Sequence, residues 1–111
     1  MHTIPVQTWF QSTEAKVLRH AYVEKHFPAL SGYSLKSLLG NCLYLSQLSM
    51  RCGDWEARRI IHKQTLELLE QYPLTKETKT IMTVKERFWM EMANKNLTMT
   101  CQIRNLLRIG L

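Results

Sequence analysis

The segment that most constrains the fold runs from Arg51 to Pro73, because it joins two amphipathic patterns through the two-residue break Gly53-Asp54. Before the break, apolar residues recur at steps of three and four, the period of a buried helix face. After it, a second such stripe continues until Pro73, where a helix cannot easily go on. Helices joined this tightly must fold back on each other, so the sequence predicts an antiparallel helical hairpin.

The chain from Ser12 onward repeats this helical period, residues 1–11 show no period, and no segment sustains the alternation of a strand. We therefore predict an all-α fold, a tetratricopeptide-like bundle of antiparallel hairpins forming one domain over residues 1–111. The predicted elements are an extended lead-in at residues 1–11 and about five helices near 12–27, 33–51, 54–72, 75–93 and 97–108.

Capping residues define the predicted boundaries. The candidate N-caps, whose side-chain oxygens can accept a backbone N–H, are Ser12, Ser31, Asp54, Thr75 and Asn96. Gly53 is the predicted C-cap of the second helix. Within that helix the small residues Gly40 and Ser46 predict close approach of a neighbouring helix, at a modest cost in helix propensity.

The apolar stripes of these helices predict the core. Its expected members are Leu18, Leu38, Leu39, Cys42, Leu45, Ile60, Ile61, Leu68, Phe88 and Ile103. The three cysteines are an odd set without Cys-x-x-Cys spacing, which favours structural burial over metal or redox use. A reducing, cytoplasmic setting fits such cysteines. The chain has no apolar run of the roughly 18 residues that a membrane-spanning helix needs.

The residues that carry chemistry are sparse. Asp54 is the only aspartate, and the four histidines, His2, His20, His26 and His62, do not have the spacing of a metal site. A glycine-rich phosphate loop and a nucleophile elbow are both missing. We therefore expect neither a catalytic residue nor a metal or cofactor site within these residues.

Charge is the remaining signal for function. The net charge of +6 favours anionic partners, and the densest basic group lies at Arg58, Arg59, His62 and Lys63. Solvated helix surface is the ordinary interpretation of such a group, with an anionic membrane or an acidic polymer as the alternatives and nucleic acid less favoured. Trp55 either packs inward and staples the hairpin, which the sequence slightly favours, or stands exposed as an anchor. The candidate interaction surface is therefore Trp55, Arg58, Arg59 and Lys63.

The hairpin resembles a tetratricopeptide repeat in its aliphatic-small pair Leu45-Ser46, its Gly53-Asp54 turn, the following Trp55 and the late Pro73. It is also similar to the helical region that follows the catalytic domain of bacterial family-two glycosyltransferases. Those tails contain a phrase like residues 53–61, Gly-Asp-Trp-Glu-Ala-Arg-Arg-Ile-Ile, often preceded by one like residues 25–30, Lys-His-Phe-Pro-Ala-Leu.

This resemblance implies that the chain is the C-terminal part of a larger enzyme of bacterial surface polysaccharide synthesis. The nucleotide-sugar fold, the Asp-x-Asp motif and the catalytic base would then lie upstream, so no catalytic residue is carried over to this sequence. Two functional hypotheses follow. One is a non-catalytic accessory domain that contacts its upstream catalytic domain, with an anionic membrane surface as a second candidate partner. The other is a free-standing basic module that binds an acidic protein or nucleic acid.

Overall fold

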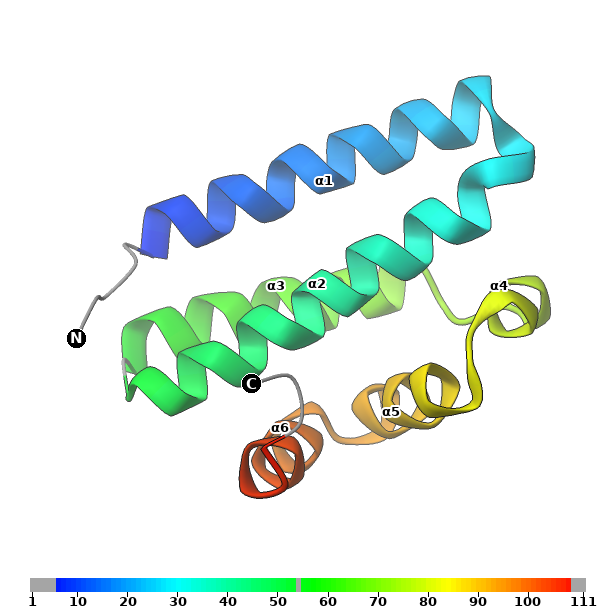
Figure 1. The fold of residues 1–111 in the computed structure, drawn as a ribbon. Helices are drawn as coiled ribbons and strands as arrows, with labels where there is room; N and C mark the ends of the chain where they lie inside the picture. Colours follow the sequence, from blue (N-terminus) through cyan, green and yellow to red (C-terminus); the bar gives the residue numbers. More distant parts are fainter. Residues whose placement is uncertain (1–5, 54, 109–111) are drawn as a thin grey trace.

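The computed structural model describes residues 6–53 and 55–108, with side chains from Gln11 onward. In these residues it contains α-helices and one short 3-10 helix but no strand, so the all-α prediction is confirmed (Figure 1). The elements are α1 (Val6–His26), η1 (Pro28–Leu30), α2 (Ser31–Cys52), α3 (Trp55–Gln71), α4 (Lys76–Ile81), α5 (Val84–Lys95) and α6 (Leu97–Leu106).

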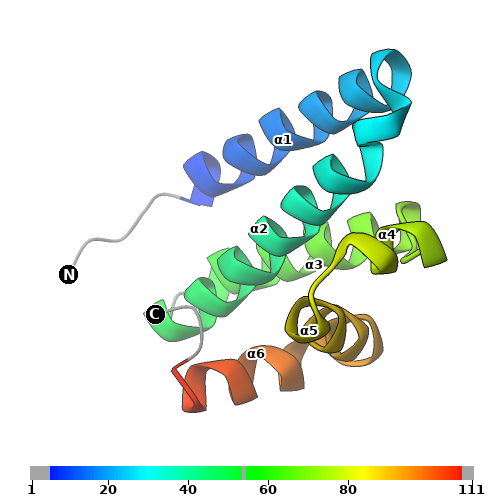
Figure 2. The same ribbon diagram turned by 45° about the vertical axis from the view of Figure 1, so that its right-hand side comes forward.

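The helix α2 is the centre of the arrangement. It contacts every other helix, most extensively α3 and α1, and α4, α5 and α6 also pack against it. Figures 1 and 2 show the long helices α1, α2 and α3 grouped together, with the shorter α5 and α6 below α2. Gly53 ends α2 with a left-handed φ of 70°, a conformation that glycine adopts without strain. The predicted hairpin and its C-cap are therefore confirmed.

The first helix begins earlier than predicted. The extended lead-in at 1–11 is wrong from Val6 onward, because α1 starts there and Ser12 lies inside it rather than at its N-cap. Val6 directly follows a proline, a residue tolerated at a helix start, and no helix breaker separates it from Ser12. Residues 1–5 lie outside the described part of the chain.

Three further caps differ in outcome. Thr75 and Asn96 cap their helices as predicted, by accepting hydrogen bonds from the backbone N–H groups of residues 78 and 99. Ser31 does not, because η1 leads directly into α2 and the Ser31 hydroxyl donates to the Pro28 carbonyl 2.8 Å away. The predicted cap Asp54 lies outside the described residues.

The predicted fourth helix at 75–93 is two helices. Met82 is extended, with a ψ of 147°, and Thr83 caps the new helix α5. A reciprocal pair of bonds makes this cap: the Glu86 amide donates to Thr83 Oγ1 at 3.1 Å, and the Thr83 amide donates to Glu86 Oε1 at 2.9 Å. The bond from the Thr83 amide is the main reason that the pKa of Glu86 is lowered. The carboxylate therefore stays ionised at neutral pH and keeps the cap.

Replacing Thr83 by alanine should lower the free energy of unfolding by about 1 kcal/mol, the usual loss for a removed N-cap hydroxyl. Thr80→Ala is the matched control, because the exposed Thr80 hydroxyl donates within α4 to the Lys76 carbonyl and caps no helix. Urea denaturation followed by circular dichroism gives both values. Equal losses for the two variants would show that the Thr83 cap stabilises the fold no more than the non-capping hydroxyl of Thr80 does.

Five predicted core residues are buried: Leu38, Leu39, Cys42, Ile61 and Leu68. Leu45, Ile60 and Ile103 are half-buried. Two predictions are wrong, since the exposed fraction is 72% for Leu18 and 53% for Phe88.

Each error has a physical cause. On α1 the buried face carries the polar residues Thr13 and His20 beside the half-buried Val17, so a search for apolar stripes extends around the helix to the exposed Leu18. The break at Met82 means that α5 does not continue the helical period of α4. The buried face of α5 therefore carries Met90 and Ala93, and Phe88 is exposed.

Buried polar contacts hold the helices around α2. The hydroxyls of Ser46 and Thr65 lie 3.1 Å apart between α2 and α3, which confirms the close approach predicted at Ser46. Gln47, also buried, accepts a hydrogen bond from Arg104 Nε on α6 at 2.8 Å. These contacts satisfy groups that would otherwise be costly to bury.

The cysteines are free thiols. Burial raises the pKa of Cys42 to about 12 and that of Cys101 to about 11. Both are therefore protonated and poor nucleophiles near neutral pH. In the described part of the chain, no helix combines the length and apolarity needed to cross a membrane.

Candidate functional site

Trp55 is the first residue of α3, directly after the hairpin turn, and its exposed fraction is 75%. The sequence left two orientations open and slightly favoured inward packing; the structure shows the exposed one. The buried face of α3 begins two residues later with Ala57 and continues through Ile61 and Leu68. Trp55 lies off that face, so its indole ring stands in solvent as a large apolar surface with no core to fill.

The basic residues of α3 share the side on which Trp55 lies. Positions 55, 58, 59, 62 and 63 follow the three- and four-residue steps of one helix face. The Arg58 guanidinium carbon sits 4.8 Å from the centroid of the Trp55 ring, which is a cation–π contact. Arg59 and Lys63 are exposed one helical turn apart. We call Trp55, Arg58, Arg59 and Lys63 the Trp55 face.

A shallow depression of about 440 Å³ lies at the start of this face. Its lining includes Trp55, Arg58, Arg59 and the half-buried His62, whereas Lys63 lies just beyond it on the exposed side. Burial, and then the charge of Arg58, lower the pKa of His62. The imidazole is therefore neutral at pH 7, and the positive charge of the Trp55 face comes from its two arginines and Lys63.

This depressed pKa predicts a pH effect on stability. Because the folded chain holds His62 at a pKa below the ordinary 6.5, the unfolded chain binds more protons as the pH falls through that value. The free energy of unfolding should therefore fall as the pH is lowered from 7 to 5. In His62→Gln the free energy of unfolding should depend less on pH over this range. Urea midpoints measured across this range provide the test. An unchanged slope in the variant would rule out His62 as the group responsible.

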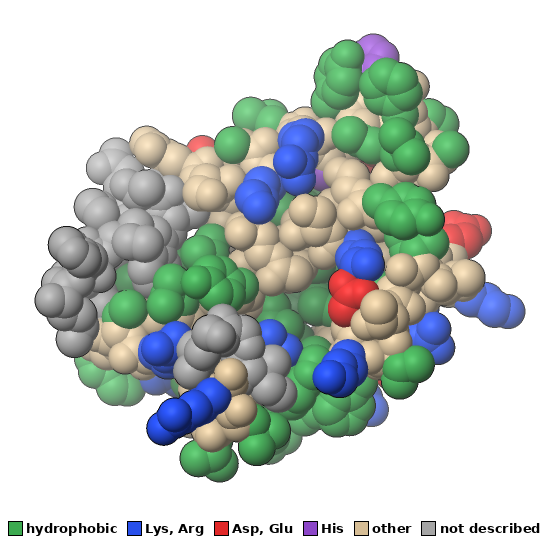
Figure 3. All heavy atoms as spheres, viewed as in Figure 1, with side chains coloured by type: hydrophobic (Ala, Val, Ile, Leu, Met, Phe, Trp, Pro, Cys, Tyr) green, Lys and Arg blue, Asp and Glu red, His purple; other side chains and the backbone are tan. Residues whose placement is uncertain are grey.

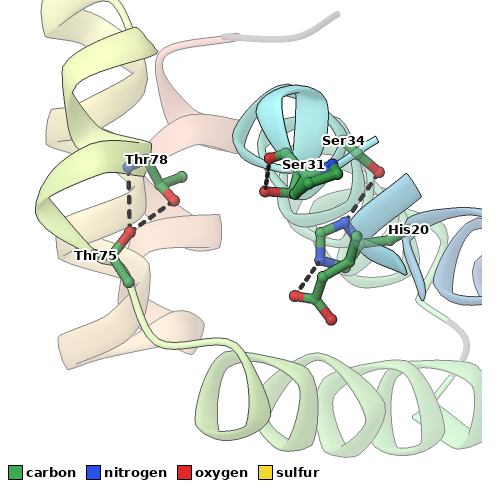
Figure 4. Close-up of polar contacts among 7 residues, drawn as sticks. His20, Ser31, Ser34, Thr75 and Thr78 are labelled. Carbon is green, nitrogen blue, oxygen red and sulfur yellow. Dashed lines mark hydrogen bonds and ion pairs between the residues drawn. The ribbon is translucent and has the colours of Figure 1, made fainter. Parts of the chain in front are cut away.

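A second cluster surrounds His20, where α1, the start of α2 and the end of α3 meet (Figure 4). His20 is buried, its Nδ1 lies 3.0 Å from Ser34 Oγ, and its Nε2 lies 3.8 Å from Glu24 Oε2. The rings of His20 and Tyr72 are nearly perpendicular, with their centroids 4.9 Å apart. The sequence did not predict this cluster, because His20 and Ser34 belong to different helices and lie 14 residues apart.

The order serine, histidine, glutamate resembles that of a hydrolase triad, but the geometry favours a structural role. A cleft of about 390 Å³ lies beside the cluster, and the described residues that line it include His20 and Glu24 but not Ser34. A substrate in the cleft would not meet the hydroxyl that should attack it. The Nε2–Glu24 distance also exceeds hydrogen-bond length. The Ser34–His20 contact instead connects α1 to α2.

The surface also carries an apolar patch. Exposed apolar side chains gather where α1 passes through η1 into α2, at the upper right of Figure 3. They include Tyr22, Phe27, Leu30 and Tyr33. For metal binding, the described part of the chain brings together no group of three or more His, Cys, Asp or Glu side chains.

No protein-family model, curated protein or solved structure matches this chain. The resemblance to glycosyltransferase tails therefore stays a prediction from the sequence.

Proposed function

We propose that this chain is a helical interaction module that binds an acidic protein surface through the Trp55 face. The observation that carries the proposal is the exposed Trp55 indole with the Arg58 guanidinium stacked on it. Tryptophan and arginine are the residues that most often dominate binding energy in protein interfaces. An exposed tryptophan that fills no core has no role in the fold that would account for it.

The charges of the site favour an acidic protein over a broad polyanion. Arg58, Arg59 and Lys63 lie within two turns of one helix, and Glu56 lies beside them at the depression. Polymers such as nucleic acids are usually held by longer basic tracks, with aromatic rings spaced along them for stacking. A compact site with one aromatic anchor matches one acidic patch, with electrostatic complementarity giving specificity and a fast on-rate.

The sequence resemblance supplies a candidate for this patch. In a family-two glycosyltransferase the acidic surface would belong to the upstream catalytic domain, and the helical module would position that domain for surface polysaccharide synthesis. As a free-standing module, the chain would bind a separate acidic protein. The Trp55 face is the contact in both versions, so one set of variants tests both.

The proposal can be tested with fluorescently labelled poly-L-glutamate as an acidic polypeptide probe. We expect the purified chain to bind it, and the triple reversal of Arg58, Arg59 and Lys63 to glutamate to weaken binding at least tenfold, or about 1.4 kcal/mol. Trp55→Ala should weaken binding without any change in charge. Fluorescence anisotropy at low ionic strength gives the affinities, because salt screens such contacts.

The matched control reverses three exposed cations elsewhere, Lys76, Arg87 and Lys95, and changes the net charge by the same amount. If both triple reversals weaken binding equally, only net charge matters and the Trp55 face is not a site. Two further probes are phosphatidylserine vesicles and duplex DNA. If either binds through the Trp55 face while poly-L-glutamate does not, the acidic-protein proposal is wrong.

A further inference from the structure

Gly40 lies in the middle of α2, where glycine weakens a helix by its backbone freedom. The sequence predicts that it allows a neighbouring helix to approach closely, and that prediction is wrong. Gly40 is exposed, and a Cβ placed on it would meet no atom within 4 Å among the described residues. The missing side chain therefore leaves open space on the surface of α2 where other residues would project.

That space belongs to a cavity of about 250 Å³ between α2, α5 and α6. Its apolar lining is Leu43 from α2, Met82 and Met90 beside and within α5, and the half-buried Trp89. The exposed fraction of Leu43, Met82 and Met90 is 5% each, so they are core residues whose side chains also line the cavity. Methionine side chains adapt their shape to varied apolar ligands.

A fixed positive charge stands at this cavity. The Arg104 guanidinium donates from Nε to the buried Gln47 and lies 5.1 Å from the centroid of the Trp89 ring. It is half-buried, and that burial lowers its pKa, although an arginine stays charged at physiological pH. The acid at the cavity, Glu86, already pairs with Lys36 at 2.9 Å. Arg104 forms no ion pair with any carboxylate of the described residues.

We propose that this cavity is a binding site for a small amphipathic carboxylate. A partly desolvated cation without an acidic partner gains most from an anion placed against it. The apolar lining supplies the complementary surface for a hydrocarbon or aromatic body. This inference is independent of the Trp55 face, which lies on α3 rather than at α5 and α6.

The geometry also defines how such a ligand is held. Because Gln47 occupies Arg104 Nε, the two terminal NH₂ groups remain to receive both carboxylate oxygens end-on. The exposed Lys85 at the rim adds a second charge. A volume of about 250 Å³ falls just below the range of roughly 300–1,000 Å³ for drug-sized ligands. A medium-chain fatty acid and a single aryl carboxylate are both small enough to belong to this class.

The experiment is calorimetric titration of the intact chain with octanoate and with indole-3-acetate, using octylamine and octanol as matched probes. We expect at least one of the two acids to bind with a stoichiometry of one, and the acid that binds identifies the ligand body. Octylamine should not bind, because its charge is repelled by Arg104 and Lys85. Octanol should bind at least tenfold more weakly than octanoate, because it offers Arg104 no charge.

The decisive variant is Gly40→Leu, which fills the cavity from open space and strengthens the helix propensity of α2. Circular dichroism should show it folded, and its affinity for the acid should fall at least tenfold. The exposed Ser37→Leu on the same helix is the control and should bind normally. The proposal is overturned if neither acid binds, if octanol binds as tightly as octanoate, or if the folded Gly40→Leu chain keeps full affinity.

Discussion

Replacing Leu39 or Ile61 by alanine is expected to lower the free energy of unfolding by about 2–5 kcal/mol, the range for large-to-small changes at buried sites. Each of these side chains is only 1% exposed. They lie on α2 and α3, the two helices of the hairpin. Either truncation therefore leaves a void at or near the contact between α2 and α3, and the other helices pack against this hairpin. Urea denaturation followed by circular dichroism measures the loss.

The control is Leu18→Ala, the same chemical change at a side chain that is 72% exposed. It should alter the free energy of unfolding by no more than about 0.5 kcal/mol, as surface changes usually do. A loss that small at both Leu39 and Ile61 would mean that the buried faces of α2 and α3 have been placed incorrectly.

Replacing Gln47 by leucine should cost about 1.5–3 kcal/mol, the range for a hydrogen bond to a charged group. The change keeps the size of the side chain but removes the oxygen that accepts from Arg104 Nε at 2.8 Å. Arg104 is then left half-buried with its Nε unpaired. The contact between α2 and α6 is reinforced by Asn105 Nδ2, which donates to the Gln47 carbonyl at 3.2 Å.

The exposed Gln102 on α6 serves as the matched control for this second prediction. Gln102→Leu should leave stability within about 0.5 kcal/mol of the parent chain. If Gln47→Leu is equally harmless, the contact between Gln47 and Arg104 contributes nothing to docking α6 on α2.

Local signals predicted the hairpin correctly. The leucine period of α2, the glycine that ends it and the caps Thr75 and Asn96 all act within a few residues of where they occur, so the sequence alone reveals them. The break before α5 has a local signal too, since Thr83-x-x-Glu86 is a capping box. The apolar stripe through residues 81–92 concealed it.

The burial of polar residues depends on non-local contacts, so the sequence did not reveal it. α1 buries its polar residues Thr13 and His20, and no apolar period identifies that face, because the partner of His20 is Ser34 on another helix. From the sequence alone, Gln47 would be expected on the surface. It is buried in the fold, where it accepts a hydrogen bond from Arg104, 57 positions later.

The candidate sites divide in the same way. Helical spacing predicted that Trp55, Arg58, Arg59 and Lys63 share one side of α3, but it could not decide whether the Trp55 indole packs inward. The cavity beside Gly40 involves three helices, so the glycine inside α2 was visible in the sequence but the residues that complete the cavity were not.

The most direct test of the central claim, that the Trp55 face binds an acidic protein surface, is an NMR titration of nitrogen-labelled chain with poly-L-glutamate. Each tryptophan indole N–H gives its own resonance, and Trp55→Phe identifies the signal of Trp55. We predict that this signal moves on titration, while that of Trp89, half-buried between α5 and α6, stays in place. Binding that leaves the Trp55 signal unmoved would contradict the account.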